Sequence, residues 1–251
     1  MLTAELIAPP SWHKLDFISD LHLQVSEPAT FNAWRHYMQT TETDAVFILG
    51  DLFEVWVGDD VLQAHGFEQQ CAEIIRETAS RVPTFFMHGN RDFLVGSNLM
   101  AACNSTLLSD PTVLIFNDQR LVLSHGDALC LDDTSYMAFR QQVRCVDWQK
   151  IFLAKPLSER QAIARALRQQ SEEKKQSSVA YADVDTDAAL LLLTKSKATT
   201  LIHGHTHKPA NHDLGLGLQR VVLSDWDAAA TPPRVEILRL TANGLQRSNL
   251  I

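Results

Sequence analysis

Five short apolar segments of this chain are each followed within two residues by glycine, aspartate or histidine, and this pattern constrains the fold most. The segments are rich in β-branched and aromatic residues, which is typical of strands buried on both faces. Amphipathic stretches at 30–38 and 68–79 lie between the first ones and predict helices. We therefore expect an α/β core, with further strands near Val221–Leu223 and Val235–Leu240. The five apolar segments are Leu15–Ile18, Ala45–Leu49, Thr84–Met87, Leu121–Leu123 and Thr200–Ile202.

The polar residues after these strands are carboxylate, amide and imidazole side chains, with no thiol among them. Ligands of α/β sheets bind beyond the carboxyl ends of the strands, so we expect these side chains to meet at one edge. Such donors suit Mn²⁺, Fe²⁺, Zn²⁺ or Mg²⁺. They are too many for one ion, and two ions about 4 Å apart would use them all. The donors are Asp20, His22, Asp51, Asn90, Asp92, His125, His203, His205 and His207, and the cationic Arg91 lies next to Asn90.

Taken singly, these motifs are weak, because a lone aspartate or histidine after a strand is often only a turn former. The ordered set is more specific, and it resembles the calcineurin-like metallophosphoesterase superfamily. That resemblance covers roughly residues 15–226 and implies a β-sandwich core flanked by helices. By position it assigns Asp20, His22, Asp51 and His207 to one metal ion. It assigns Asp51, Asn90, His125 and His205 to the second, with Asp51 bridging.

Longer matching stretches, such as residues 48–60, 88–93 and 124–133, resemble the branch of this superfamily that acts on a UDP-linked diacylglucosamine in bacterial lipid A synthesis. This similarity runs from about Leu15 to Leu240 and implies hydrolysis of the pyrophosphate bond, with water activated by two metal ions attacking the α-phosphorus. It implies Mn²⁺ as the metal and a lipid-linked UDP-sugar as the substrate. The implied substrate contacts are Asn90, Arg91, Asp133, Ser171, Lys175, Ser178 and His205.

Arg91 occupies a position where the general family motif has histidine. An arginine cannot protonate a departing alkoxide, because its pKa is too high, but it can stabilise developing negative charge. A phosphate leaving group, with its second pKa near 6, needs no proton to depart. Arg91 thus favours pyrophosphate cleavage, and we expect it to act in catalysis with Asp51 and Asn90. The alternative is a surface arginine paired with Asp92 or Asp59.

Residues 136–197 form a helical stretch with few strand signals, and we interpret them as an insertion, a lid over the core of residues 1–135 and 198–251. Phe139, Trp148, Phe152 and Leu153 are candidates to receive acyl chains, although such apolar stripes are more often ordinary core. The polar, basic stretch 171–178 predicts a break between helices, and its lysines could equally be a solvated surface. Asp185 is expected to cap a last helix, Thr186–Ser196.

The formal net charge of −8 argues against a nucleic-acid-binding protein, which would carry a basic face. The four cysteines form no C-x-x-C pair, and we expect reduced thiols in a cytoplasmic protein. We find no signal-peptide pattern and no apolar run long enough to span a bilayer. A diacylated substrate would bring the protein transiently to the cytoplasmic face of the inner membrane, and we expect a monomer.

Three other functions stay open from the sequence. The chain could be a different phosphodiesterase, nucleotidase or phosphatase of the same superfamily, against which Arg91 and the long insertion argue. It could be a non-catalytic scaffold, although every ligand position is intact. It could also be a metal-binding regulator without turnover.

Overall fold

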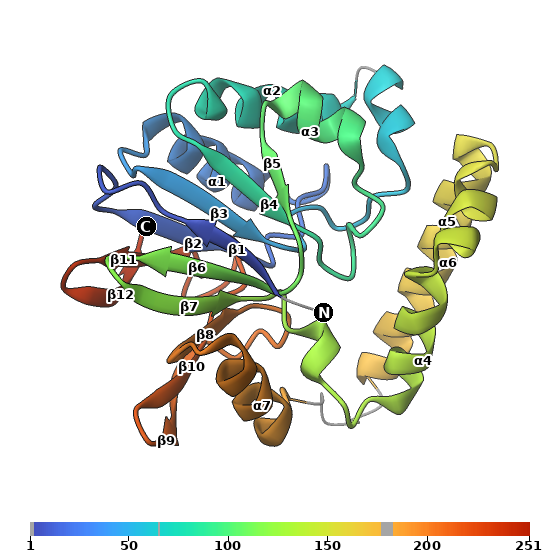
Figure 1. The fold of residues 1–251 in the computed structure, drawn as a ribbon. Coiled ribbons are helices and arrows are strands. Elements are labelled where there is room, and N and C mark those ends of the chain that lie inside the picture. Colours follow the sequence, from blue (N-terminus) through green and yellow to red (C-terminus); the bar gives the residue numbers. More distant parts are fainter. Residues whose placement is uncertain (1–2, 65, 177–182) are drawn as a thin grey trace.

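Two six-stranded sheets form the centre of the protein in the computed structural model, which describes residues 3–64, 66–176 and 183–251 (Figure 1). The first sheet has the order β1 (Ala4–Ile7), β6 (Thr112–Phe116), β7 (Gln119–Leu123), β8 (Thr200–His203), β10 (Leu218–Val222) and β9 (Ala210–Gly215). The second has the order β12 (Gly244–Asn249), β11 (Glu236–Thr241), β2 (Leu15–Ile18), β3 (Ala45–Leu49), β4 (Thr84–Met87) and β5 (Thr106–Leu108).

Alternating side chains of the central strands pack into two different cores. In the parallel strands β2, β3 and β4, Phe17 lies opposite Phe47, which lies opposite Phe85. These rings stack at centroid distances of 5.0 and 4.8 Å and belong to the core between the sheets, together with residues of β6, β7, β8 and β10. Val46 and Ile48 belong instead to the core shared with the helices. Burial on both faces explains the continuous apolar runs in the sequence.

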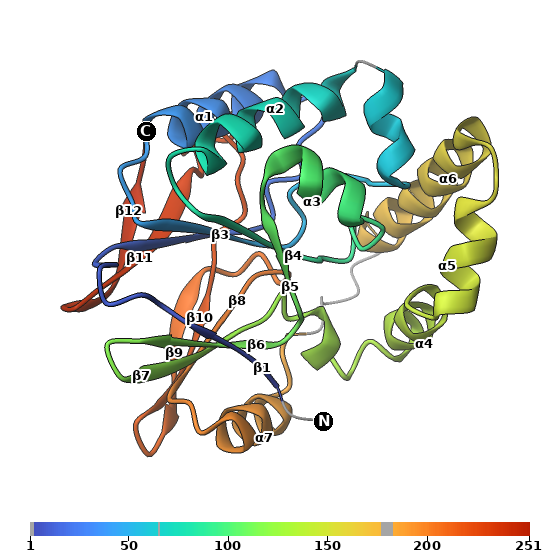
Figure 2. The ribbon, with the colours of Figure 1, turned by 45° about the horizontal axis from the view of Figure 1, so that its top comes forward.

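Helices cover the outer face of each sheet and complete four layers (Figures 1 and 2). The helices α1 (Pro28–Thr40), α2 (Phe67–Ala79) and α3 (Ser97–Cys103) cover the second sheet. The helix α7 (Thr186–Ser196) covers the first sheet, and its Leu193 packs with residues of β7 and β8. Two short 3-10 helices, η1 (Asp59–Ala64) and η2 (Asp127–Leu129), lie in loops. The predicted α/β class with a β-sandwich core flanked by helices is confirmed.

Three helices stand beside this sandwich, at the right of Figure 2: α4 (Thr134–Val143), α5 (Val146–Leu153) and α6 (Leu157–Gln176). They are anchored by apolar residues, among them buried Phe152 and partly buried Trp148, which pack with the core under α1–α3. Of the predicted insertion 136–197, α4 to α6 form this separate part, whereas α7 packs on the first sheet. Among the described residues, none of the helices combines the length and apolarity that crossing a bilayer requires.

Of the predictions for the helices near residues 171–196, one is wrong and one is confirmed. The prediction of a break between helices at 171–178 is wrong for residues 171–176, because α6 continues to Gln176. Glutamate, lysine and glutamine are strong helix formers, so a polar, charged stretch continues a helix readily. The last helix begins and ends at the predicted residues, and its Asp185 cap accepts a hydrogen bond of 2.7 Å from the backbone N–H of Ala188.

Candidate metal centre

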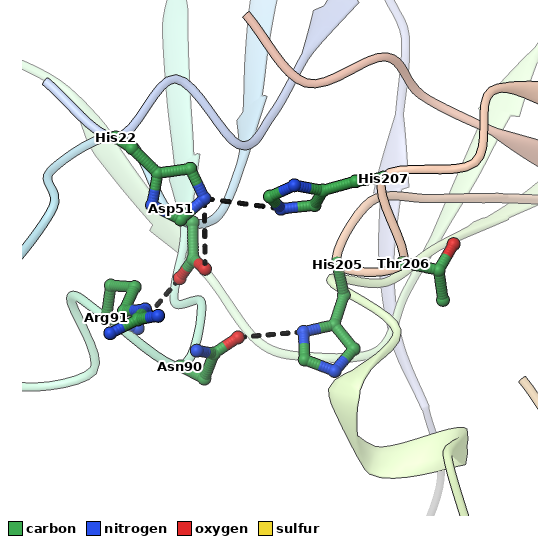
Figure 3. A pocket seen from close by; sticks show the side chains of 7 residues that line it. All are labelled: His22, Asp51, Asn90, Arg91, His205, Thr206 and His207. Carbon is green, nitrogen blue, oxygen red and sulfur yellow. Dashed lines mark hydrogen bonds and ion pairs between the residues drawn. The ribbon is translucent and has the colours of Figure 1, made fainter. Parts of the chain in front are cut away.

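The predicted ligand residues gather where strands of both sheets end. Asp20 and His22 follow β2, Asp51 follows β3 and Asn90 follows β4, all in the second sheet. His125 follows β7, and His205 and His207 follow β8, in the first sheet. The expected single sheet edge is thus the junction of two sheets. A pocket opens there (Figure 3), and its lining residues are His22, Asp51, Asn90, Arg91, His205, Thr206 and His207.

One group of donors consists of Asp20, His22 and His207, whose ligand atoms lie within 4.8 Å of one another. His207 Nε2 lies 3.3 Å from Asp20 Oδ1 and 3.3 Å from His22 Nε2. Two imidazole nitrogens that face each other cannot both donate to each other, so at least one presents a lone pair. Asp20 Oδ1 is buried without a hydrogen-bond partner. A divalent cation would satisfy all three groups.

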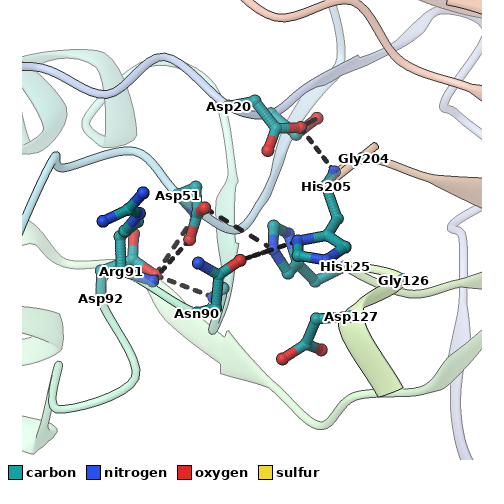
Figure 4. A network of polar contacts seen from close by, with 12 residues as sticks. Asp20, Asp51, Asn90, Arg91, Asp92, His125, Gly126, Asp127, Gly204 and His205 are labelled. Carbon is teal, nitrogen blue, oxygen red and sulfur yellow. Dashed lines mark hydrogen bonds and ion pairs between the residues drawn. The ribbon is translucent and has the colours of Figure 1, made fainter. Parts of the chain in front are cut away.

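The second group is formed around Asn90. Its Oδ1 lies 3.0 Å from His125 Nε2 and 2.8 Å from His205 Nδ1 (Figure 4). His125 Nδ1 lies 2.9 Å from the carbonyl oxygen of Leu49, so its Nδ1–H donates there and its Nε2 is left to accept or to bind a metal. Asp51 Oδ2 lies 3.7 Å from that Nε2.

Asp51 lies between the two groups. The same Oδ2 atom that faces His125 is 3.9 Å from His22 Nε2 in the first group. Asp20, Asp51 and His125 also form a set whose ligand atoms lie within 4.8 Å of one another. Both carboxylates are buried. This arrangement fits two cations with a shared carboxylate, which is what the sequence predicts for Asp51.

The electrostatics of the pocket favour cations. Burial alone would raise the pKa of Asp20, but its contact with His207 and the charges of nearby histidines hold that pKa far below its usual range. Burial opposes protonation of His125, yet the negative charge of Asp51 and other carboxylates raises its pKa to about 9. Burial, followed by the positive charge of His125, lowers the pKa of His205 to about 4. The carboxylates therefore create a strongly negative field, which a divalent ion would neutralise.

The backbone at this site has an unusual conformation. Left-handed φ angles are rare for residues other than glycine and store strain, which accumulates at functional sites. Such turns aim successive side chains into one small volume immediately after each strand. The ligands with left-handed φ are Asp20 (φ 55°), His22 (49°), Asp51 (53°), His205 (69°) and His207 (53°).

Glycines beside these ligands leave no room for a side chain. A Cβ atom on Gly89 would lie 2.8 Å from Asp51 Cγ and even closer to that residue's backbone nitrogen. A Cβ on Gly204 would meet the Asp20 carboxylate and lie 2.8 Å from Ser19 Cβ. The glycines in the two motifs thus allow the loop backbone to approach the carboxylates of Asp20 and Asp51 closely.

Arg91 lies at the pocket and is not the surface arginine of the alternative interpretation. Its backbone N–H donates to Asp51 Oδ1 at 2.7 Å, and its guanidinium lies 3.6 Å from Glu54. Asp92 does not pair with it: this buried carboxylate accepts backbone hydrogen bonds of 2.8 Å from Gly89 and Leu52. Burial and the nearby Asp51 charge raise the pKa of Asp92 to about 7.

Asp59, the other alternative partner of Arg91, is also engaged elsewhere. It accepts hydrogen bonds from Trp56 Nε1 at 3.0 Å and from the backbone N–H groups of Gly96 and Leu99 at the start of α3. It therefore stabilises the N-terminus of that helix. Arg91 is left to face the pocket and Glu54.

The remaining predicted substrate contacts, Asp133, Ser171, Lys175 and Ser178, are not among the described residues that line the pocket. Asp133 is exposed and caps α4, accepting a hydrogen bond of 2.9 Å from the backbone N–H of Tyr136. Ser171 and Lys175 lie in α6, in the part of that helix where only the backbone is described. Ser178 lies outside the described residues.

Sequence reasoning missed a charged group that joins the centre to the insertion. The buried Asp127 carboxylate accepts hydrogen bonds from Tyr136 Oη at 2.5 Å and from Arg140 Nε at 2.8 Å, both on α4. Arg144 donates to the carbonyl oxygen of Gly89 at 2.9 Å. The only available signal was that Asp127 follows His125 by two residues. Glu54, three residues after Asp51, was missed in the same way.

Known proteins resemble this chain in sequence. Residues 13–209 match the family model of the calcineurin-like phosphoesterases. A protein of Chromobacterium violaceum named UDP-2,3-diacylglucosamine hydrolase is 45% identical over 84% of this chain and 90% of its own length. Proteins of the same name from Cellvibrio japonicus and Bordetella pertussis are 42% and 39% identical, covering 86% and 93% of this chain and 95% and 93% of their own lengths. Among solved structures, an archaeal phosphodiesterase superposes with a TM-score of 0.48 and 12% identity, over 94% of this chain and 99% of its own.

Proposed function

This chain belongs to the calcineurin-like phosphoesterase family, and from that premise we propose that it hydrolyses UDP-2,3-diacylglucosamine to UMP and 2,3-diacylglucosamine 1-phosphate. The observation that carries the proposal is similarity over most of the chain to relatives named for this substrate. The protein is then a metal-dependent hydrolase of lipid A biosynthesis. The buried ligand set with Arg91 at its mouth supports the same reaction.

We propose that Asp20, His22, Asp51 and His207 hold one divalent ion and that Asp51, Asn90, His125 and His205 hold the other. The oxygen and nitrogen donors fit Mn²⁺, which we propose as the native metal. When bound, two such ions lower the pKa of water and neutralise charge on the phosphate oxygens. His125 is held as a ligand by Leu49, and Asp51 by the backbone N–H of Arg91.

Arg91 stabilises negative charge as the bond between the α-phosphorus and the bridging oxygen breaks. The new bond joins a water oxygen to the α-phosphorus, and the leaving group is the lipid 1-phosphate. The guanidinium of Arg91 cannot act as an acid near neutral pH, but a phosphate leaving group needs no proton to depart. Asn90, with one amide group beside both His125 and His205, helps to orient the α-phosphate. Asp133, Ser171, Lys175 and Ser178 are proposed contacts to the rest of the substrate.

The helices α4 to α6 are proposed to receive the acyl chains. Of the candidates from sequence, Phe152 is buried and Trp148 stacks on it at 4.9 Å, so both already serve as core. Leu153 is 41% exposed, and nearby Val146, Ile151 and Leu167 are also exposed. Where such exposed apolar side chains form one contiguous patch, that patch is suited to lipid or membrane contact. We propose a monomer that works at the cytoplasmic face of the inner membrane.

The proposal is tested by incubating the purified protein with UDP-2,3-diacylglucosamine, with and without Mn²⁺, and detecting UMP and the lipid 1-phosphate by mass spectrometry. We expect Mn²⁺-dependent products that Asp51→Ala abolishes and that the surface variant Glu77→Gln leaves unchanged. Cleavage of generic phosphodiesters but not of this lipid would refute the substrate. Metal binding without any cleavage would favour the regulator, and absence of both would favour the scaffold.

A further inference from the structure

Glu54 is a buried carboxylate that touches three different parts of the protein. Its side chain is only 11% exposed. One oxygen, Oε2, lies 3.1 Å from His22 Nδ1, an ion-pair contact without the alignment of a hydrogen bond. The other, Oε1, lies 3.0 Å from an Nη atom of Arg168 on α6 and 3.6 Å from one of Arg91. The two oxygens thus face a metal-ligand candidate on one side and two arginines on the other.

The backbone holds Glu54 firmly in this place. The segments after β2 and β3 run side by side and form a parallel bridge between Leu23 and Phe53. The N–H of Leu23 donates to the carbonyl of Leu52 at 2.8 Å, and the N–H of Glu54 donates to the carbonyl of Leu23 at 3.1 Å. This bridge lies one residue beyond His22, so it fixes the distance between His22 and the Glu54 carboxylate.

A carboxylate at Nδ1 decides what the opposite ring nitrogen can do. When Nδ1 carries the proton and pairs with a carboxylate, Nε2 presents its lone pair and the ring becomes a better metal ligand. His22 Nε2 is the atom that faces Asp51 and His207. The guanidinium groups of Arg168 and Arg91 on the other side of Glu54 favour the ionised carboxylate.

We propose that Glu54 is a positioning residue of the metal centre: Oε2 holds the His22 ring with Nε2 toward the metal, and Oε1 holds Arg91 and the α6 residue Arg168. One carboxylate therefore contacts a metal-ligand candidate, the arginine at the pocket and the helix α6. The inference rests on the metal centre of the proposed function, but not on the identity of the substrate.

The test measures Mn²⁺ affinity directly, without turnover. Metal-free wild-type protein, Glu54→Gln and the control Glu236→Gln are titrated with Mn²⁺, and free Mn²⁺ is followed by electron paramagnetic resonance. Glu236, which lies on β11, pairs with Arg247 at 2.7 Å, so this control removes an ion pair away from the site. We expect Glu54→Gln to weaken one of two Mn²⁺ sites by about tenfold to a hundredfold and to spare the other. The control should bind as wild type does.

A double-mutant cycle shows whether Glu54 acts through His22. In a His22→Ala background, Glu54→Gln should weaken Mn²⁺ binding no further, because the ring that it positions is gone. An equal further loss in that background, or unchanged affinity of Glu54→Gln at both sites, would overturn the inference. Equal weakening of both sites together with a lower Tm of the metal-free protein would overturn it too, because it would indicate a general role in folding.

The variant Arg168→Met tests the role of Oε1 of Glu54 separately from the role of Oε2. We expect wild-type Mn²⁺ affinity but a raised KM for UDP-2,3-diacylglucosamine, because the variant removes the contacts of α6 with Glu54 and Gln24 but keeps the contact between Glu54 and His22. Loss of Mn²⁺ affinity in this variant would contradict the division of roles. Wild-type protein that binds two Mn²⁺ ions but leaves the lipid intact refutes only the substrate, whereas wild-type protein that binds no Mn²⁺ refutes the metal centre and this inference together.

Discussion

Gly89→Ala should damage the metal centre through a single added carbon. Its Cβ would lie 2.8 Å from Asp51 Cγ, whereas carbon atoms pack at about 3.5 Å or more. Asp51 Oδ1 and the Asp51 backbone nitrogen would lie closer still. The Asp51 carboxylate must therefore move by at least roughly 0.7 Å, which exceeds the tolerance of about 0.5 Å within which functional groups must be held. A misplacement of about 1 Å can cost about a hundredfold in rate, so we expect kcat to fall by roughly tenfold to a hundredfold.

The assay follows Mn²⁺-dependent hydrolysis together with Mn²⁺ affinity and urea unfolding of the metal-free protein. Overpacking a close-packed position costs about 1–3 kcal/mol, so the unfolding free energy should also fall. Gly66→Ala is the matched control, because within the described part of the chain its Cβ would meet only Glu68, at an ordinary 3.5 Å. If Gly89→Ala retains wild-type kcat and affinity for both ions, the close approach of this backbone does not position Asp51.

Three further outcomes are expected. Arg91→Lys should lower kcat by about a hundredfold or more while leaving Mn²⁺ affinity unchanged, since lysine lacks the planar, bidentate donor set; equal loss of metal binding would assign Arg91 to the metal instead. Chelation of the metal should abolish hydrolysis and lower Tm, because a ligand that binds only the folded state stabilises it; a Tm unchanged by chelation and by re-addition of Mn²⁺ would count against the centre. A hydrogen bond from Arg220 lowers the pKa of Asp183 from 3.8 to about 2, so this pair stabilises the folded protein above pH 3.8 and the stabilisation is lost as the pH falls toward 2. Arg220→Met should flatten that part of the pH dependence of urea unfolding, and a slope identical to wild type would refute the assignment.

The sequence predicted strands and helices best where the signal is local. The boundaries of β2, β3 and β4 were predicted to the residue, because each continuous apolar run ends at a polar turn. The start of α7 was predicted from Asp185, because aspartate is a preferred N-cap residue. The extent of α6 was missed because a charged, polar stretch was taken for a loop, although its residues are good helix formers.

Partition of the strands into two sheets depends on pairing between distant segments, which local pattern does not encode. The strand β8 pairs in parallel with both β7 and β10, so its histidines arrive from the first sheet, while Asp20 and Asp51 arrive from the second. The residue types of the metal centre were evident from sequence, but the junction that brings them together was not. Glu54 shows the same limit, since the bridge between Leu23 and Phe53 brings it to His22.

The left-handed backbone at five metal-ligand candidates has a consequence for how this protein can change over generations. Each such residue costs roughly 1–2 kcal/mol relative to a relaxed conformation, and the buried carboxylates repel one another when no cation is present. Replacing Asp20 or Asp51 by glycine would remove both penalties at once, since these two of the five are carboxylates. A duplicated gene copy that is no longer selected for catalysis would therefore gain stability while its product lost the metal. Selection for activity must oppose such substitutions, which would otherwise give a more stable protein without activity.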